Sequence, residues 1–127
     1  MEEGQGQQST ARVLKVESRD SWDSYVTQAS EQGSPIVAHF TAAWCMPSVA
    51  MNPVFEELAS SYQEALFVTV DVDDVKEIAS KYEIKAMPTF LVMKEGAQVD
   101  KLVGANPDEI RKMIEKILGA SSHIYVA

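Results

Sequence analysis

The sequence predicts a single α/β domain in which helices flank a central mixed β-sheet. Three observations support this fold class. The chain of 127 residues is long enough to bury a core without disulfide or metal staples. Its composition, with 46% hydrophobic and 24% charged residues, is that of an ordinary globular protein. Apolar segments with strand and helix periodicity alternate along the chain, which is typical of parallel strands joined by helices.

The first part of the chain predicts strand, helix and strand. Arg12–Val16 is a short strand, and Ser18 or Asp20 is expected to cap the helix that follows. That helix ends at Gly33-Ser34-Pro35, because Gly and Pro favour turns. The segment Ile36–Thr41 is apolar on both faces, which predicts a central strand covered by helices and a buried histidine within it.

The middle of the chain predicts a further helix, strand and helix. After Cys45, apolar residues recur at helical spacing, and Pro53 interrupts this helix because proline lacks a backbone N–H. Leu66–Val72 predicts a second buried strand. Asp73 or Asp74 is expected to start the helix that follows it.

In the last part of the chain, two predicted strands are joined by a short turn rather than by a helix. Thr89–Met93 and Gln98–Val103 flank Lys94-Glu95-Gly96-Ala97, which predicts an antiparallel strand pair. Pro107 is expected to start the final helix and Gly119 to end it. We therefore expect a mobile leader at 1–11, the domain at 12–119 and a tail at 120–127 that either docks on the domain or extends from it.

Composition and charge argue against several classes of partner. The net charge of −8 would repel DNA and RNA over most of the surface, so we expect no nucleic-acid binding. The longest apolar run, Ala42–Met46, is far shorter than the roughly 20 residues of a membrane helix, so no membrane association is expected. No export or transit signal is visible at the first residues, and a single cysteine cannot form an intramolecular disulfide. These observations predict a cytoplasmic protein, with the nucleus also open.

The sequence predicts no metal site and no cofactor. One cysteine and two scattered histidines do not have the spacing of a zinc site. Asp71, Asp73 and Asp74 lie close together, but they are interpreted as a strand end and a helix cap rather than as metal ligands.

A thiol lies at the junction between the central strand and the next helix. In Phe40-Thr41-Ala42-Ala43-Trp44-Cys45-Met46-Pro47-Ser48, the cysteine precedes the first turn of that helix. Unsatisfied N–H groups and the helix dipole stabilise a thiolate there, so Cys45 is predicted to be a nucleophile. The alternative is a buried, inert cysteine.

From about residue 12 to 119 the chain resembles a thioredoxin of the plant h type. The matching stretches are Phe40–Ser48, Asp71-Val72-Asp73, Ala86-Met87-Pro88-Thr89-Phe90 and Val103-Gly104-Ala105. The resemblance implies a thioredoxin-like fold and a cis Met87-Pro88 peptide facing the active site, where it would bind an extended substrate segment. It also implies a client-docking surface around the thiol, made of Trp44, Met46, Pro47, Met87, Pro88 and Ala105.

Two departures from the family pattern bear on mechanism. The thioredoxin motif is Cys-x-x-Cys, and Ser48 stands in place of the second cysteine. A serine hydroxyl cannot displace sulfur, so the intramolecular release of a mixed disulfide is missing, although Ser48 could donate a hydrogen bond to the Cys45 thiolate. His39 replaces a buried aspartate and Thr69 a nearby lysine. His39 is interpreted either as a base or proton shuttle for Cys45 or as a neutral interior histidine.

The sequence therefore predicts a monothiol Cys-x-x-Ser protein with Cys45 and Ser48 as its catalytic pair. The predicted function is thiol–disulfide exchange on protein thiols and disulfides, isomerase-like and with weak reductase activity. One alternative is a non-catalytic adaptor that binds clients in a groove beside Pro88. Another is a glutathione-dependent monothiol oxidoreductase, with glutathione as a further partner. We expect a monomer that can form a Cys45-linked dimer under oxidation.

Overall fold

The structure, a computed structural model, describes the backbone of residues 13–126 and the side chains of residues 13–119. In chain order the elements are β1 (Val13–Val16), α2 (Arg19–Gln32), β2 (Ile36–Thr41), α3 (Met46–Ala50), α4 (Asn52–Ser61), β3 (Leu66–Asp71), α5 (Lys76–Lys81), β4 (Thr89–Lys94), β5 (Ala97–Val103) and α6 (Pro107–Val126). The predicted leader lies outside the described residues.

The five strands form one mixed sheet in the order β1-β3-β2-β4-β5. β1 and β2 both pair parallel with β3, while β4 pairs antiparallel with β2 and with β5. β2 is thus the middle strand, and five of its six residues are buried. The predicted fold class, the central strand and the antiparallel hairpin are all confirmed.

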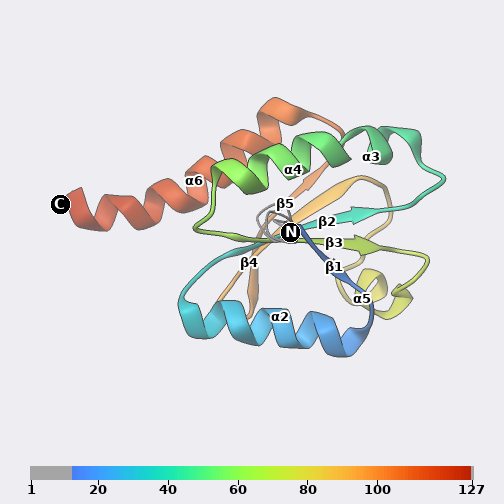
Figure 1. Ribbon diagram of the computed structural model, residues 1–127, viewed down its shortest axis with the longest axis horizontal. Helices are drawn as coiled ribbons and strands as arrows, with labels where there is room; N and C mark the ends of the chain where they lie inside the picture. Colours follow the sequence, from blue (N-terminus) through green and yellow to red (C-terminus); the bar gives the residue numbers. More distant parts are fainter. Residues whose placement is uncertain (1–12, 127) are drawn as a thin grey trace, which may run out of the picture.

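Helices cover both faces of the sheet (Figure 1). α2 and α5 lie on one face, where Trp22 and Ile78 pack with Phe40 of β2 in one buried cluster. α4 and α6 lie on the other, where Phe55 and Ile114 belong to a second cluster. Burying β2 between these two layers removes its apolar side chains from water on both sides, which favours folding. The C-terminal end of β2, where Cys45 follows, is the edge at which the site forms.

Helix α2 has well-defined caps at both ends. Ser18, rather than Asp20, is the N-cap: its side chain accepts from the backbone N–H of Ser21, and the Ser21 side chain accepts from the Ser18 N–H. This reciprocal pair satisfies two helix N–H groups. At the other end Gly33 adopts a left-handed conformation with φ of 71° and closes the helix onto Ala29. The predicted end of this helix is confirmed.

The helix predicted after Cys45 is two helices. α3 ends at Ala50, Met51 separates the two, and α4 begins at Asn52. Pro53 carries no N–H to donate to the carbonyl of Val49, so the hydrogen-bond ladder breaks one turn before it.

The predicted start of α5 at Asp73 or Asp74 is wrong, since the helix begins at Lys76. The carboxylate of Asp71 accepts from the Asp73 N–H, and the Asp71 carbonyl accepts from the N–H groups of Asp74 and Val75. A side chain that satisfies the backbone locally offers an alternative to the helix. These aspartates therefore form a turn that delays it.

The hairpin is tighter than predicted. β5 begins at Ala97, and the turn consists of Glu95 and Gly96, with φ of 52° and 82°. Positive φ at both central residues is the signature of the two-residue type I′ turn, whose twist matches that of paired strands.

The prediction that the last helix ends at Gly119 is wrong, because α6 continues to Val126. Gly119 does not take the left-handed conformation that Gly33 takes, so it does not cap the helix. A glycine inside a helix costs only about 1 kcal/mol relative to alanine, which does not by itself end the helix. Figure 1 shows this end of α6 extending past the sheet. The side chains on which docking of the tail would depend lie outside the described residues.

Among residues 13–126, none of the helices combines the length and apolar character that crossing a bilayer requires.

Candidate active site

Cys45 is the N-cap of α3 and lies in the short loop after the central strand. Its backbone N–H donates to the carbonyl of Ala42 at 3.0 Å, and its own carbonyl accepts from Val49 at 3.0 Å. Pro47 lies in the first turn of α3, where a missing N–H has no cost. The Cys45 side chain itself makes no capping hydrogen bond and is half-buried. Its sulfur is thus not bound by the helix backbone, and the residue keeps part of its surface in solvent.

The segment before β4, which contains Met87 and Pro88, lies against the Cys45 thiol. The Cys45 thiol donates to the carbonyl oxygen of Met87 at 3.4 Å, across 42 residues of chain. The Met87–Pro88 peptide bond is cis. The Pro88 carbonyl accepts from Gly104 at 2.9 Å, and the hydroxyl of Thr89 donates to the Ala86 carbonyl at 2.6 Å. These bonds hold the segment against the thiol.

The indole of Trp44 is fixed by a residue from the loop after β3. Its Nε1–H donates to the carboxylate of Asp73 at 2.7 Å. The side chain is nevertheless 65% exposed. The hydrogen bond orients an otherwise solvent-exposed aromatic ring beside the thiol.

Apolar side chains surround the thiol on the surface. Met46 is 67% exposed and Val103 is 59% exposed, and both are large hydrophobic residues. Pro47 and Ala105 are exposed as well. The client-docking surface stays a prediction: four of its six predicted members are exposed, whereas Met87 is half-buried and Pro88 is buried.

Ser48 lies behind the thiol and faces the interior. It is fully buried, and its hydroxyl donates to Thr41 Oγ1 at 2.6 Å. The same oxygen is 3.3 Å from His39 Nε2. Because a hydroxyl carries one proton, a hydrogen bond from Ser48 to a Cys45 thiolate would require that proton to leave Thr41. The predicted role of Ser48 as a thiolate stabiliser stays a prediction.

His39 is buried, as predicted, in an aromatic environment. Its ring stacks on Phe90, with centroids 4.7 Å apart and planes at 18°, and contacts Phe55 at 5.2 Å. Desolvation by burial lowers the pKa of His39 from 6.5 to about 4. The imidazole is therefore neutral at pH 7, and its Nδ1 is buried with no hydrogen-bond partner among the described residues. The polar contact of Nε2 is with Ser48, while Thr69 donates to the His39 backbone carbonyl at 3.4 Å.

Two residues of the site have roles that the sequence did not predict. Thr41 holds the Ser48 hydroxyl, and Asp73 holds the Trp44 indole. A buried hydroxyl and an indole N–H each need a partner, but the sequence does not show which residue supplies it. Within residues 13–119, no three or more His, Cys, Asp and Glu side chains are grouped so that they could hold a metal ion.

The arrangement can attack a disulfide but cannot complete its reduction alone. The Cys45 thiolate would form a bond to one client sulfur while the other leaves as a thiolate. The position three residues along the helix carries an oxygen in place of a resolving sulfur, and the chain has one cysteine. The fold and the site together define a thioredoxin-like protein with a single active thiol.

Comparison with known proteins gives the same class. The family described as Thioredoxin matches residues 13–116, so the chain belongs to the thioredoxin family, whose chemistry is thiol–disulfide exchange. The chain is 59% identical over 117 residues to Thioredoxin-like protein CXXS1 of Arabidopsis thaliana, which covers 92% of this chain and 99% of that protein. A protein of the same name from Oryza sativa subsp. japonica is 54% identical over 105 residues, 83% of this chain and 79% of that protein.

Solved structures confirm the resemblance to h-type thioredoxins. A poplar wild-type thioredoxin h superposes with a TM-score of 0.82 at 39% identity, covering 85% of this chain and 97% of that one. A thioredoxin from Nicotiana alata gives a TM-score of 0.79 at 36% identity, covering 83% and 91%.

Proposed function

We propose that this chain exchanges disulfides on protein clients in an isomerase-like manner, with little independent reductase activity. The observation that supports the proposal is the side chain at position 48, which is a serine in place of a second cysteine. A fully buried hydroxyl there donates to Thr41, and the chain has no second thiol. Oxygen at this position cannot expel a client from Cys45, so release depends on a thiol from outside the chain.

Isomerisation needs no second thiol on the enzyme. The Cys45 thiolate attacks a client disulfide, forming one S–S bond as another breaks and freeing a client thiolate. A different client thiolate then attacks the mixed disulfide and expels Cys45 unchanged. Electrons balance within the client, so no external reductant is consumed. Net reduction would instead require a further thiol, and glutathione is the class of reductant that we propose for it.

The proposal predicts that the protein accelerates reactivation of a scrambled multi-disulfide protein more than it reduces a stable disulfide. Both rates are measured at the same protein concentration, across a range of glutathione ratios. Cys45→Ser is expected to abolish the refolding effect. Refolding at the uncatalysed rate in the presence of wild type would show that the chain is not an exchange catalyst.

The exposed apolar side chains around the thiol favour a second candidate, a non-catalytic adaptor. Trp44, Met46 and Val103 together offer a contact surface whose apolar burial does not depend on the sulfur. Cys45→Ala distinguishes the two candidates. An adaptor keeps its bound partners in this variant, whereas an exchange catalyst loses its activity and its disulfide-linked clients. A Cys45-linked dimer under oxidation, which we also propose, would be lost in the same variant.

A further inference from the structure

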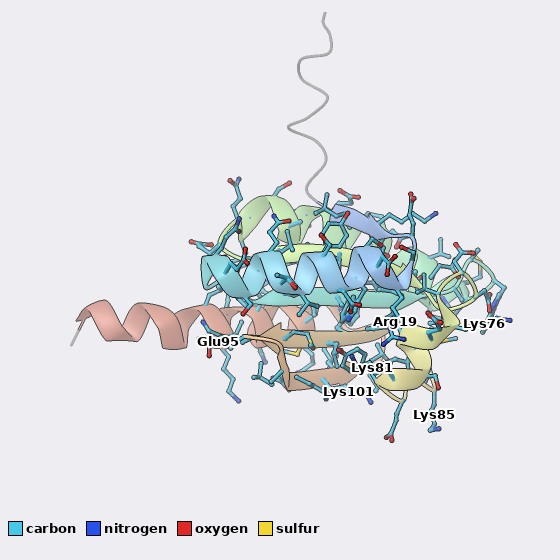
Figure 2. All side chains as sticks on the ribbon, turned by 90° about the horizontal axis from the view of Figure 1, so that it is seen from below. Arg19, Lys76, Lys81, Lys85, Glu95 and Lys101 are labelled. Carbon is cyan, nitrogen blue, oxygen red and sulfur yellow. The ribbon has the colours of Figure 1, made fainter. Side chains whose placement is uncertain are left out.

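Basic residues are distributed unevenly in this acidic chain. No Lys or Arg occurs between Arg19 and Lys76, although the net charge is −8. Lys81, Lys85 and Lys101, here called the lysine cluster, lie on one face of the molecule, with Arg19 of α2 beside them (Figure 2). All three lysines are exposed. Three lysines thus lie close together in an otherwise acidic chain, with exposed Glu83 between Lys81 and Lys85 in the sequence.

The cluster is built around the turn that follows α5. Lys101 of β5 donates its Nζ to the carbonyls of Tyr82 at 3.2 Å and Glu83 at 3.4 Å. Lys81 Nζ lies 5.5 Å from the centroid of the Tyr82 ring. Within residues 13–119, none of the three lysines has a carboxylate oxygen within 4.0 Å. Their charges are therefore not neutralised by close ion pairs in the fold.

The cluster approaches the reactive thiol through Lys85. Lys85 is two residues before Met87, whose carbonyl accepts from Cys45, and two residues span at most about 7 Å. Along β5, Lys101 is two residues from Val103, so both side chains are on the same face of the strand. Val103 is paired with Thr89, next to Pro88. A continuous surface therefore leads from the thiol over exposed Val103 to the lysines.

We propose that the lysine cluster is a second contact for the clients of Cys45 and selects clients with acidic side chains a few residues from the attacked disulfide. The inference rests on the proposed exchange function and adds its substrate class. Lysine ammonium groups attract an opposite charge over roughly a Debye length, about 8 Å at physiological salt, so client carboxylates a few residues from the attacked disulfide can be attracted to the cluster. Because the chain as a whole is acidic, a polyanion is repelled, whereas a short acidic segment can be attracted by the three lysines.

The test uses two synthetic peptides that differ only in charge. Each carries one cysteine as a mixed disulfide with 5-thio-2-nitrobenzoate, with either Glu or Gln at positions two to four residues from the cysteine on both sides. Attack by Cys45 forms the protein–peptide disulfide and releases the coloured thiolate, whose absorbance gives the rate. We expect the glutamate peptide to react about fivefold faster than the glutamine peptide. At about 1 M salt, where screening acts over about 3 Å, the two rates should converge.

Charge-neutral variants locate the effect. Lys81→Gln combined with Lys85→Gln should remove the preference for the glutamate peptide and leave the glutamine peptide unchanged. Lys101 is retained because it binds backbone carbonyls. The matched control is Lys15→Gln combined with Lys116→Gln, exposed positions on β1 and α6 with the same change in net charge, and it should keep the preference.

The outcomes separate the selection from the exchange chemistry. Equal rates for the two peptides with wild type, or an equal loss of preference in the control variant, would overturn the role of the lysine cluster while leaving exchange intact. Failure of both peptides to react faster with wild type than with Cys45→Ser would overturn the exchange function and the selection with it.

Discussion

Ser48→Cys raises disulfide reductase activity by at least about tenfold over wild type. The substitution supplies the missing thiol at the third residue of α3, beside the N-cap Cys45, and side chains at these two positions of a helix lie next to each other. Intramolecular attack on a mixed disulfide is far faster than attack by millimolar external thiols, because the effective concentration of a well-placed group is very high. Turbidity of reduced insulin, with a dithiol as the terminal reductant, measures the gain.

Ser48→Ala is the matched comparison for this gain. Like Ser48→Cys, it removes the Ser48 hydroxyl that contacts Thr41 and His39, but it adds no sulfur. Its reductase rate should therefore stay at the wild-type level. No increase in Ser48→Cys would mean that Met46 or His39 blocks turnover as well. In that case the missing thiol alone would not explain the weak reductase activity.

Adding His39→Asp to Ser48→Cys should increase the reductase rate further. His39 Nε2 lies 3.3 Å from the position-48 side chain, so an acid placed there could take up and return the proton of the new thiol. Comparing the double variant with Ser48→Cys over a range of pH tests the idea. If the two variants had equal rates at every pH, the residue at position 39 would have no effect on the reaction of the second thiol.

Acidification should destabilise the fold through His39 by roughly 3 kcal/mol between pH 6.5 and pH 4. Burial lowers the pKa of His39 to about 4 in the folded chain, against 6.5 for the free side chain. In this window the unfolded chain binds a proton that the folded chain does not, so the free energy of unfolding falls as pH falls. Above pH 6.5 both states are neutral, and below about 4 both are charged, so the loss is confined to the window.

Chemical denaturation at several pH values measures this dependence. His39→Gln serves as the control, because an amide can still hydrogen-bond Ser48 but does not titrate in the window. The control should have a smaller slope of stability against pH, whatever its stability at neutral pH. Parallel slopes for the two proteins would show that His39 is accessible to protons in the folded state.

Much of the fold could be predicted because its signals are local. A segment that is apolar on both faces marked β2 as the central strand, and two strand segments on either side of Lys94-Glu95-Gly96-Ala97 marked the hairpin. The errors occurred at element ends, where two local preferences compete. Gly119 can end a helix or be tolerated inside one. The carboxylate of Asp71 can hold a turn where a helix was expected to start.

The sequence by itself determined the identity and order of the reactive groups in this protein. One thiol after the central strand, an oxygen three residues later and a histidine in the strand define what chemistry is available and what is missing. Only the tertiary structure decided where these groups point. The Cys45 thiol donates to the Met87 carbonyl, 42 residues away in the chain, and the buried Ser48 hydroxyl donates to Thr41. The physical reason is that a polar group can hydrogen-bond only to partners that sheet pairing and helix packing bring within about 3 Å. No local sequence pattern specifies which partners those are.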